Sequence, residues 1–436
     1  MDKLRVAVLM EDCLPTEGGG YSYYQTLLMA IDRHNFHPDI EIVYIDFFNS
    51  ANKQLQFSKQ LIRVKRSVFG AVAYRCLNLL YKIVHRLLQS HSRVYLEFIS
   101  KRMDAINNRA IRKILTKENI HLIYYLKPRE NLIDYPMIVT HWDVGHKSMY
   151  PFPEVTWNGN FKKRDNYYKT ILNKAFLILC ESETGAKELK HYYPVNPAKI
   201  KVMPLFSGEV VLITVTEKEQ LQLLSGYNLV KGSFYLYPAQ FWAHKNHSTL
   251  IYAFKLLLNQ AGNQSLKLVL CGGDQGNLSY IKKLIDESGL NNKILIPGFI
   301  TGRQLYTLYK NAIALVMPTF LGPTNIPLIE AAELECAIVC SDLEGHKEIL
   351  RDNALYFDPS SASEIKDCMQ QVLNNKFREQ LVSSAYHFIR NSSFQVQRSI
   401  PLLDRFLQEL KPVRTTWGVG IKLFFAFAKI GILSIN

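Results

Sequence analysis

Short apolar segments alternate with helical segments along almost the whole chain, and this alternation limits the possible folds more than any other feature. The apolar segments that predict strands before residue 206 are Arg5–Leu9, Ile40–Ile45, His121–Tyr125, Met137–Thr140, Phe176–Cys180 and Ile200–Met203. After residue 230 they are Phe234–Tyr237, Lys267–Cys271, Lys293–Ile296, Ala312–Met317 and Ala337–Cys340. Strands that alternate with helices predict an α/β protein with parallel sheets.

The chain has 436 residues, which is too long for one ordinary hydrophobic core. Its two series of strands therefore predict two doubly wound domains with a cleft between them. We expect the first domain at 1–205, with a basic helical insertion at about 55–115. Residues 206–230 lack a clear core pattern and are interpreted as a linker. The second domain is expected at 231–395, followed by a C-terminal helix and apolar tail at 396–436.

The formal net charge of +14 predicts a partner with negative charge. Fifteen Lys and Arg residues lie between positions 53 and 117, with only two acidic residues among them. Within this segment, Leu61–Leu88 has apolar residues on one side and Arg75, Lys82 and Arg86 on the other, which is typical of a basic amphipathic helix or pair of helices. No nucleic-acid-binding repeat or motif accompanies the charge, so we expect an anionic membrane surface and no nucleic acid.

The C-terminal segment is apolar from Trp417 onward, interrupted by Lys422, Lys429 and Asn436. It is just long enough to span a bilayer, but the two lysines favour a position in the membrane interface. Packing on the protein's own core is the alternative for this tail and for Leu61–Leu88. The scattered cysteines contain no CxxC pair, and the N-terminus does not predict a signal peptide. We therefore expect a cytoplasmic protein, peripheral on the inner face of the cell membrane.

The stretch PTFLGPTNIPLIEAAELE, Pro318–Glu335, predicts a ligand site. A turn rich in Gly and Pro joins an apolar strand to a helix that opens near Pro327. Unpaired backbone N–H groups and the positive end of the helix dipole then face one point, which suits a diphosphate. Glu330, one turn into the helix, can accept hydrogen bonds from ribose hydroxyls. The alternative is an ordinary strand–turn–helix connection with a proline in the first helical turn.

Three further stretches predict the same kind of ligand. Gly18, Gly19 and Gly20 follow the first strand and let the backbone approach a phosphate or sugar closely. Lys245, at a helix start after the first strand of the second series, can neutralise a leaving diphosphate. The turn containing Gly272 and Gly273 suits a nucleotide base or ribose. His244 and His247 are interpreted as capping or packing residues, and no DxD motif predicts a metal.

The stretch THWDVGHKSMYPFPE, Thr140–Glu154, places three polar residues on one loop after a strand. His141, Asp143 and His146 at the edge of a cleft can bind sugar hydroxyls or a reacting oxygen. The alternative is a local turn capped by Asp143, with His146 on the surface.

These stretches, in this order, resemble glycosyltransferase family 4, a retaining family with the GT-B fold of two facing Rossmann-like domains. The similarity extends from the first strand to about Asp358 and is strongest in Asp143–Glu154 and Tyr237–Glu330. It implies a nucleotide-diphosphate sugar as donor in the second domain, an acceptor in the first domain, and catalysis in the cleft. It implies no metal and no cofactor, because the nucleotide sugar is a substrate.

The chain departs from the family pattern at three places. The family's E-x7-E motif ends at Glu330, but Gly322 stands here at the position of its first Glu. Gly322 belongs to a GPTNIP sequence, in which the resemblance implies that Thr324, Asn325 and Ile326 contact the donor. An Arg that often precedes the phosphate-binding Lys245 by five residues is Gln240. The His-Asp pair of the first domain aligns as Trp142-Asp143, so the resemblance implies that His141 or His146 takes the place of that His.

The resemblance implies a hexosyltransferase that passes a sugar to a glycan or lipid-linked acceptor, in cell-surface polysaccharide biosynthesis. The acceptor hydroxyl would attack from the face that the diphosphate leaves, with its proton passing to the departing phosphate oxygen. Three alternatives stay open: an epimerase of GT-B fold that acts on a nucleotide sugar, a non-catalytic glycosyltransferase-like partner subunit, and a nucleic-acid-binding protein.

Overall fold

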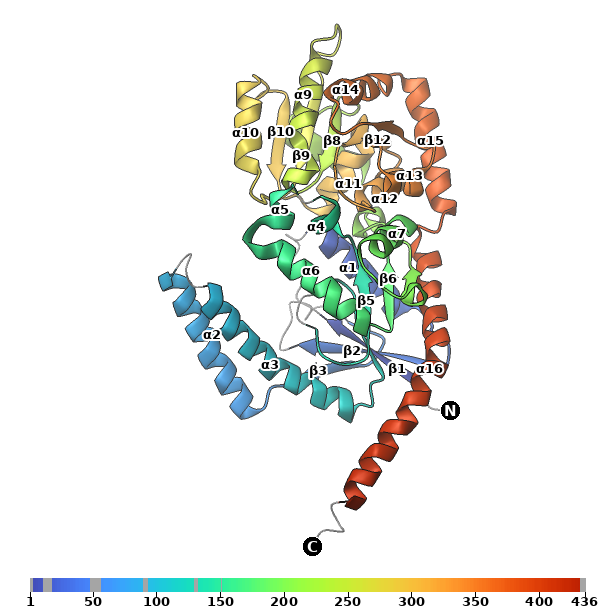
Figure 1. Cartoon of the computed structure of the whole chain (residues 1–436). Coiled ribbons are helices and arrows are strands. Elements are labelled where there is room, and N and C mark those ends of the chain that lie inside the picture. Colours follow the sequence, from blue (N-terminus) through green and yellow to red (C-terminus); the bar gives the residue numbers. More distant parts are fainter. Residues whose placement is uncertain are drawn as a thin grey trace.

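The computed structural model describes residues 3–10, 18–47, 56–88, 93–128, 132–149 and 151–431. This part of the chain forms two α/β units, each built on a parallel sheet (Figure 1). The first sheet has the order β3-β2-β1-β4-β5-β6-β7. Its strands are β1 (Leu4–Met10), β2 (Ile40–Phe47), β3 (Leu61–Val64), β4 (Leu122–Tyr125), β5 (Met137–His141), β6 (Leu177–Cys180) and β7 (Ile200–Val202).

The second sheet has the order β10-β9-β8-β11-β12-β13. Its strands are β8 (Phe234–Pro238), β9 (Lys267–Cys271), β10 (Ile294–Gly298), β11 (Ala314–Met317), β12 (Ala337–Ser341) and β13 (Leu355–Phe357). The central strands are mostly apolar because helices cover both faces of each sheet and bury most of their side chains.

Helices connect the strands of both sheets. The first unit contains α1 (Gly19–Arg33), α2 (Val68–Leu88), α3 (Arg93–Lys117), α4 (Gly145–Ser148), α5 (Pro153–Thr156), α6 (Asn160–Ile171) and α7 (Glu183–Tyr192). The next segment contains α8 (Glu217–Gly226), and the second unit contains α9 (His247–Leu258), α10 (Leu278–Glu287), α11 (Gly302–Asn311), α12 (Ile326–Glu333), α13 (Glu344–Leu350), α14 (Ala362–Gln371) and α15 (Asn375–Asn391).

Both sheets reverse their strand order at one point, between β1 and β4 in the first and between β8 and β11 in the second. The carboxyl ends of the strands at such a switch point form a crevice in which ligands bind. Gly18–Gly20 form the start of α1, which follows β1, and the segments 239–245 and 318–325 follow β8 and β11. The topology therefore places three of the predicted ligand-binding stretches at the switch points, while the turn with Gly272 and Gly273 follows the neighbouring strand β9.

Every strand expected from the sequence is present, with ends that differ by at most two residues, and the two doubly wound units are confirmed. The exact domain boundaries stay a prediction. Two short strands were not expected: β13 and β3. The prediction of helix across Leu61–Leu88 is wrong at its start, because Leu61–Val64 pairs with β2 as an edge strand and α2 begins at Val68. A four-residue apolar run does not by its period distinguish strand from helix.

Helices α2 and α3 form a hairpin that projects to one side of the first sheet (Figure 1). The Nε atom of Arg66, just before α2, donates a hydrogen bond of 2.9 Å to the side chain of Asn107 on α3. Of the helix or pair of helices expected in Leu61–Leu88, the structure has the single helix α2, and its partner α3 lies beyond that range. One face of α2 stays exposed.

The last helix, α16 (Val396–Gly431), leaves the second unit and runs along the first (Figure 1). Ser399 donates a hydrogen bond of 2.7 Å to the carbonyl of Pro204, Lys411 pairs with Asp39 at 2.6 Å, and Arg414 donates to the carbonyl of His121. The side chains of the apolar tail from Trp417 lie outside the described residues. Among the helices that are described, none combines the length and apolar character needed to cross a bilayer.

Candidate functional site

A cavity of about 620 Å³ lies between the two units, at the carboxyl ends of the strands. Asp143 lines this cavity, and so do all the residues expected to bind the donor: Gly19, Gly20, Gln240, Lys245, Gly272, Gly273, Gly322, Thr324, Asn325, Ile326 and Glu330. The structure thus brings together, from both units, residues that the sequence separates by up to 311 positions, from Gly19 to Glu330.

His141 and His146 do not lie on the cavity wall, in contrast to the expected position at the cleft edge. Both are buried inside the first unit, where Nδ1 of His141 lies 3.2 Å from the Tyr168 hydroxyl and Nε2 of His146 lies 2.6 Å from the Tyr193 hydroxyl. Burial lowers the pKa of each imidazole to about 4, so both are neutral at pH 7. His141 on β5 and His146 on α4 therefore point toward buried tyrosines of the first unit and not into the cavity.

Asp143 is ionised and already paired. Its Oδ1 accepts hydrogen bonds of 2.6 Å from Nη2 of Arg164 and from the backbone N–H of Gly145, which closes the predicted local turn. Burial would raise its pKa, but the Arg164 guanidinium and the Gly145 N–H outweigh burial and hold the pKa at about 2. So acidic a carboxyl group is a weak general base, and it places a fixed negative charge on the cavity wall.

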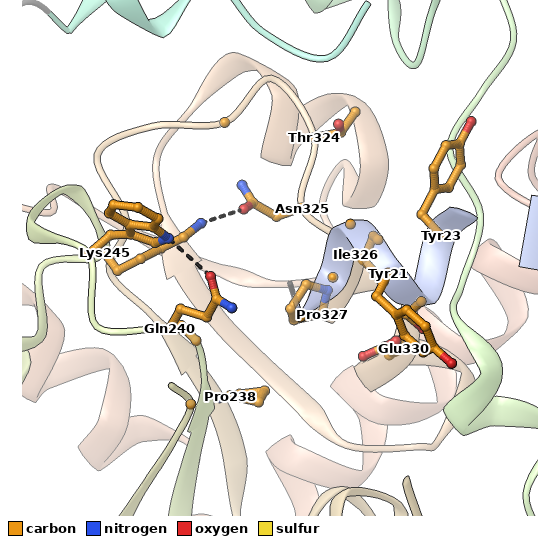
Figure 2. Close-up of a pocket in the computed structure, with 18 of the residues that line it drawn as sticks. Tyr21, Tyr23, Pro238, Gln240, Lys245, Thr324, Asn325, Ile326, Pro327 and Glu330 are labelled. Atoms are coloured by element: carbon orange, nitrogen blue, oxygen red, sulfur yellow. Dashed lines mark hydrogen bonds between the residues drawn. The ribbon is translucent and has the colours of Figure 1, made fainter. Parts of the chain in front are cut away.

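The start of α12 and Lys245 form one hydrogen-bonded unit. Nζ of Lys245 donates to Oδ1 of Asn325 at 3.2 Å (Figure 2), and Nδ2 of Asn325 lies 2.9 Å from Nε2 of His346. His346 Nδ1 lies 2.8 Å from the carbonyl oxygen of Ser341. Because a carbonyl only accepts, Nδ1 carries the proton, Nε2 accepts from the Asn325 amide, and the amide oxygen is left for Lys245.

The charges of this unit suit an anion. Burial lowers the pKa of Lys245 to about 8, while Asp143 and Glu154 oppose this shift, so the amine is mainly protonated at pH 7. Burial lowers the pKa of His346 to about 4, so this imidazole is neutral. The cation and the N-terminal end of α12 therefore face the cavity together.

Gly322 occupies a backbone conformation that excludes other residues. Its φ angle is +135°, and a Cβ atom there would lie 2.5 Å from Nδ2 of Asn325. A glutamate at this position would displace the amide that holds Lys245. The conformation of this turn therefore requires glycine where the E-x7-E pattern has its first Glu.

Glu330 lies one turn into α12, at the opposite end of the cavity wall from Lys245 (Figure 2). Tyr309 donates a hydrogen bond of 3.1 Å to its Oε2, and the backbone N–H of Gly208 is a second donor. Burial raises the pKa of Glu330 to about 7 despite these donors. A Cβ atom on Gly208 would lie 1.9 Å from the Ser22 hydroxyl and 2.8 Å from the Glu330 carboxylate, so only glycine fits beside this carboxylate.

Sequence reasoning missed two contacts in which the units meet at the cavity. Oε1 of Glu154 accepts hydrogen bonds from the backbone N–H of His244, at 2.8 Å, and from its ring Nδ1, at 2.5 Å. His244 therefore lines the cavity and joins the two units, besides its expected place at a helix start. The hydroxyl of Thr324 donates to Oε2 of Glu181 at 3.1 Å. Both pairs join residues far apart in the chain, so no local pattern predicts them.

A third contact between the units lies outside the cavity. Glu348 on α13 accepts hydrogen bonds of 2.8 Å from the backbone N–H groups of Glu183 and Thr184, which start α7. It also accepts a hydrogen bond of 2.6 Å from the Thr184 hydroxyl. A carboxylate of the second unit thus caps a helix of the first, and holds the cavity walls in this relative position.

The chain matches a known protein family over part of its length. The family model described as "Glycosyl transferases group 1" matches residues 228–388, the unit that carries Lys245 and Glu330. The "O-antigen chain mannosyltransferase B" of Escherichia coli is 24% identical over 233 residues, which are 53% of this chain and 61% of that protein. The chain therefore spans less than two thirds of the length of this relative.

Solved structures resemble nearly the whole chain. Sucrose-phosphate synthase from Thermosynechococcus elongatus has a TM-score of 0.67 at 15% identity, covering 94% of this chain and 100% of that one. Anabaena HepE in complex with UDP and glucose has a TM-score of 0.63 at 15% identity, covering 93% and 100%. At this identity the likeness establishes the fold, and these neighbours are GT-B proteins. This chain thus has the GT-B fold, and the cavity lined by the expected donor-binding residues lies between its two Rossmann-like domains.

Proposed function

We propose that this protein is a retaining glycosyltransferase of family 4 that moves a sugar from a nucleotide-diphosphate sugar to a glycan or lipid-linked acceptor. The observation that carries this proposal is the convergence of Lys245, the start of α12 and Gly18–Gly20 on one cavity, with Glu330 one turn further along. The first three features suit a diphosphate, and the carboxylate suits the ribose hydroxyls.

The glycine turn at Gly272 and Gly273 would take the nucleotide base, beside the apolar side chains of Phe299, Ile300 and Leu305 on the same wall. Thr324, Asn325 and Ile326 would meet the diphosphate from the second domain, and Gly19 and Gly20 from the first. Gln240, held by Trp242 at 3.1 Å, would donate a neutral hydrogen bond where the family often has an Arg.

In the reaction, the bond between the anomeric carbon and the β-phosphate oxygen breaks, and a bond to the acceptor oxygen forms on the same face. Negative charge develops on the diphosphate, where the Lys245 cation and the α12 start stabilise it. The acceptor proton passes to the departing phosphate oxygen. Asp143 would bind a sugar hydroxyl rather than take a proton, because Arg164 keeps it strongly acidic.

The pathway belongs to the same proposal. The matched Escherichia coli protein is a mannosyltransferase of the O-antigen chain, and HepE was solved with UDP and glucose. We therefore place this protein in cell-surface polysaccharide biosynthesis, with a hexose as the transferred group.

The test is the thermal stability of the purified protein with a panel of UDP, GDP, ADP and CMP sugars. A ligand at one hundred times its Kd stabilises a protein by about 2.7 kcal/mol, which is enough for a measurable shift in Tm. We expect one nucleotide class to raise Tm in the wild type and the rise to shrink in Glu330→Ala. If no member of the panel shifts Tm, the donor assignment fails.

The expected membrane contact also stays a proposal, and the α2 helix supports it. Its exposed apolar residues recur at helical spacing along one stripe, with 90% of Phe69, 55% of Val72 and 61% of Leu79 exposed. Arg75, Lys82 and Arg86 are exposed along one edge of that stripe. Apolar side chains beside cations suit the interface of an anionic bilayer, here the inner face of the cell membrane.

Co-sedimentation with phosphatidylglycerol vesicles tests this contact, with phosphatidylcholine vesicles as the uncharged comparison. We expect the wild type to sediment with the anionic vesicles, and Phe69→Ser combined with Leu79→Ser to reduce this. The matched control is Tyr252→Ser on α9 in the second domain, another exposed apolar residue. A truncation after Arg414 separates the contribution of the C-terminal tail. Equal sedimentation of every variant would contradict both parts of the proposal.

A further inference from the structure

Glu181 is a buried acid in the cavity wall. It follows β6 directly, lines the cavity, and is only 7% exposed. Within the described part of the chain, the carboxyl group of Glu181 accepts one side-chain hydrogen bond, from the hydroxyl of Thr324 to Oε2 at 3.1 Å. A carboxyl group buried with so few donors lowers the stability of a fold. Such residues persist where they serve a ligand.

Tyr23 is a second polar group without an internal partner. It lies one turn into α1, is 1% exposed, and packs its ring on Phe206 with ring centroids 5.4 Å apart. Its hydroxyl has no hydrogen-bond partner among the described residues, although Tyr23 lines the cavity. In Figure 2, Tyr21 and Tyr23 leave α1 in opposite directions, and Tyr23 points away from Glu330.

These two residues lie near one another. The carboxyl group of Glu181 is close enough to the Tyr23 hydroxyl to raise the pKa of Tyr23, an effect second only to burial. Burial, with a smaller contribution from Asp143, raises the pKa of Glu181 to about 8, so at pH 7 it is mainly a neutral acid. The pair therefore offers neutral donors and acceptors, which suit sugar hydroxyls and not a phosphate.

We propose that Glu181, together with Tyr23 and Thr324, binds hydroxyl groups of the sugar that the nucleotide donor carries. This inference rests on the proposed function and adds the residues that select the sugar. Thr324 lies two residues before the start of α12, where the diphosphate is proposed to bind. The sugar is bonded to that diphosphate, so it lies within reach of Thr324 and of the acid that Thr324 contacts.

The experiment compares, by calorimetry on the full chain, the affinity for a nucleotide sugar with that for its free nucleoside diphosphate. The probes are GDP-mannose with GDP, and UDP-glucose with UDP. We expect Glu181→Ala to weaken binding of the nucleotide sugar about tenfold, and to leave the free diphosphate within about twofold. Glu181→Gln, which keeps a neutral hydrogen-bonding group, should stay within about threefold of the wild type for both.

Tyr23→Phe gives a second test that does not depend on how Glu181→Ala folds. It removes only an unpartnered hydroxyl, so Tm should not fall, while the nucleotide sugar loses affinity relative to the diphosphate. An unchanged ratio of the two affinities in both variants would overturn the proposal. Equal loss of both ligands would also overturn it, because it would show a structural role.

Two further outcomes are distinct. If the affinity ratio is unchanged but transfer to the sugar methyl α-mannoside is lost, the hydroxyls belong to the acceptor and the donor assignment is wrong. If the wild type binds none of the four probes, the proposed function fails for these donors and this inference fails with it.

Discussion

Nζ of Lys245 lies 3.2 Å from Oδ1 of Asn325, so the cation on the cavity wall is held by the residue that precedes α12. Asn325 is in turn fixed by His346, whose tautomer is set by the carbonyl of Ser341. Three segments of the second domain therefore hold one amine in place. This preorganisation lets a charge act on the reaction without first having to move.

Lys245→Ala should lower kcat by a factor of about one hundred or more, because the loss of one preorganised charge donor costs about 3 kcal/mol in the transition state. Donor affinity should change less than kcat, since the charge on the diphosphate grows as the reaction proceeds. Steady-state kinetics with the donor found by the thermal panel gives both values. Turnover near that of the wild type would remove Lys245 from the mechanism.

His346→Ala should reduce turnover by about tenfold without touching any ligand directly. The substitution leaves Nδ2 of Asn325 without its acceptor, which costs about 1–3 kcal/mol in a buried site and frees the amide to turn away from Lys245. Turnover and urea unfolding report the two effects. The control is His387→Ala, an exposed histidine on α15, which should change neither. Equal turnover in both variants would show that Asn325 does not depend on His346.

Gly208→Ala should weaken nucleotide binding by about tenfold or more. Its methyl group would overlap the Ser22 hydroxyl and press on the Glu330 carboxylate, so the carboxylate must move. Gly226→Ala at the end of α8 is the matched control, because its Cβ would meet no atom within 4 Å. That variant should bind like the wild type. Similar affinities for the two variants would contradict the role of Gly208 in positioning Glu330.

Glu348→Ala should loosen the contact between the domains, with a loss of about 1–2 kcal/mol of stability and a higher KM for the donor, because α7 loses its cap. Glu344→Ala on the same helix is the control. It breaks only the exposed ion pair with Lys187, which contributes less than about 1 kcal/mol. Small-angle scattering should show a larger radius of gyration for Glu348→Ala alone. Identical scattering of the two variants would contradict this prediction.

The stability gained on replacing Glu181 by Gln should increase with pH. The pKa of Glu181 is about 8 in the folded protein, against 4.5 for a free glutamate. The unfolded chain therefore loses this proton first, and the free energy of unfolding of the wild type falls as pH rises from about 5 to 8. Glutamine does not ionise, so the variant lacks this loss. The difference in Tm should widen by a few degrees between pH 5 and pH 8. A constant difference would show that Glu181 is ionised in the folded protein.

The strands, the glycine turns and the start of α12 could be predicted from the sequence because each is a local feature. An apolar run of four or five residues, a turn with Gly, and a proline in a first helical turn each follow from neighbours in the chain. Lys245 and Glu330 were found the same way, since each stands at a fixed place relative to a strand end or a helix start. The basic character of α2 could also be predicted, whereas the four residues of β3 were too few to distinguish a strand from a helix.

The other contacts of the cavity wall could not be predicted, because they depend on which distant residues the fold brings together. Thr324 meets Glu181 across 143 positions, and His244 meets Glu154 across 90. The same holds for His141 and His146, which share a loop with Asp143 but point into the first domain instead of the cavity. Hydrogen bonds between two domains, and the burial that sets the pKa of Glu181, arise from packing over the whole molecule. Neither these hydrogen bonds nor this burial can be predicted from residues that are neighbours in the chain.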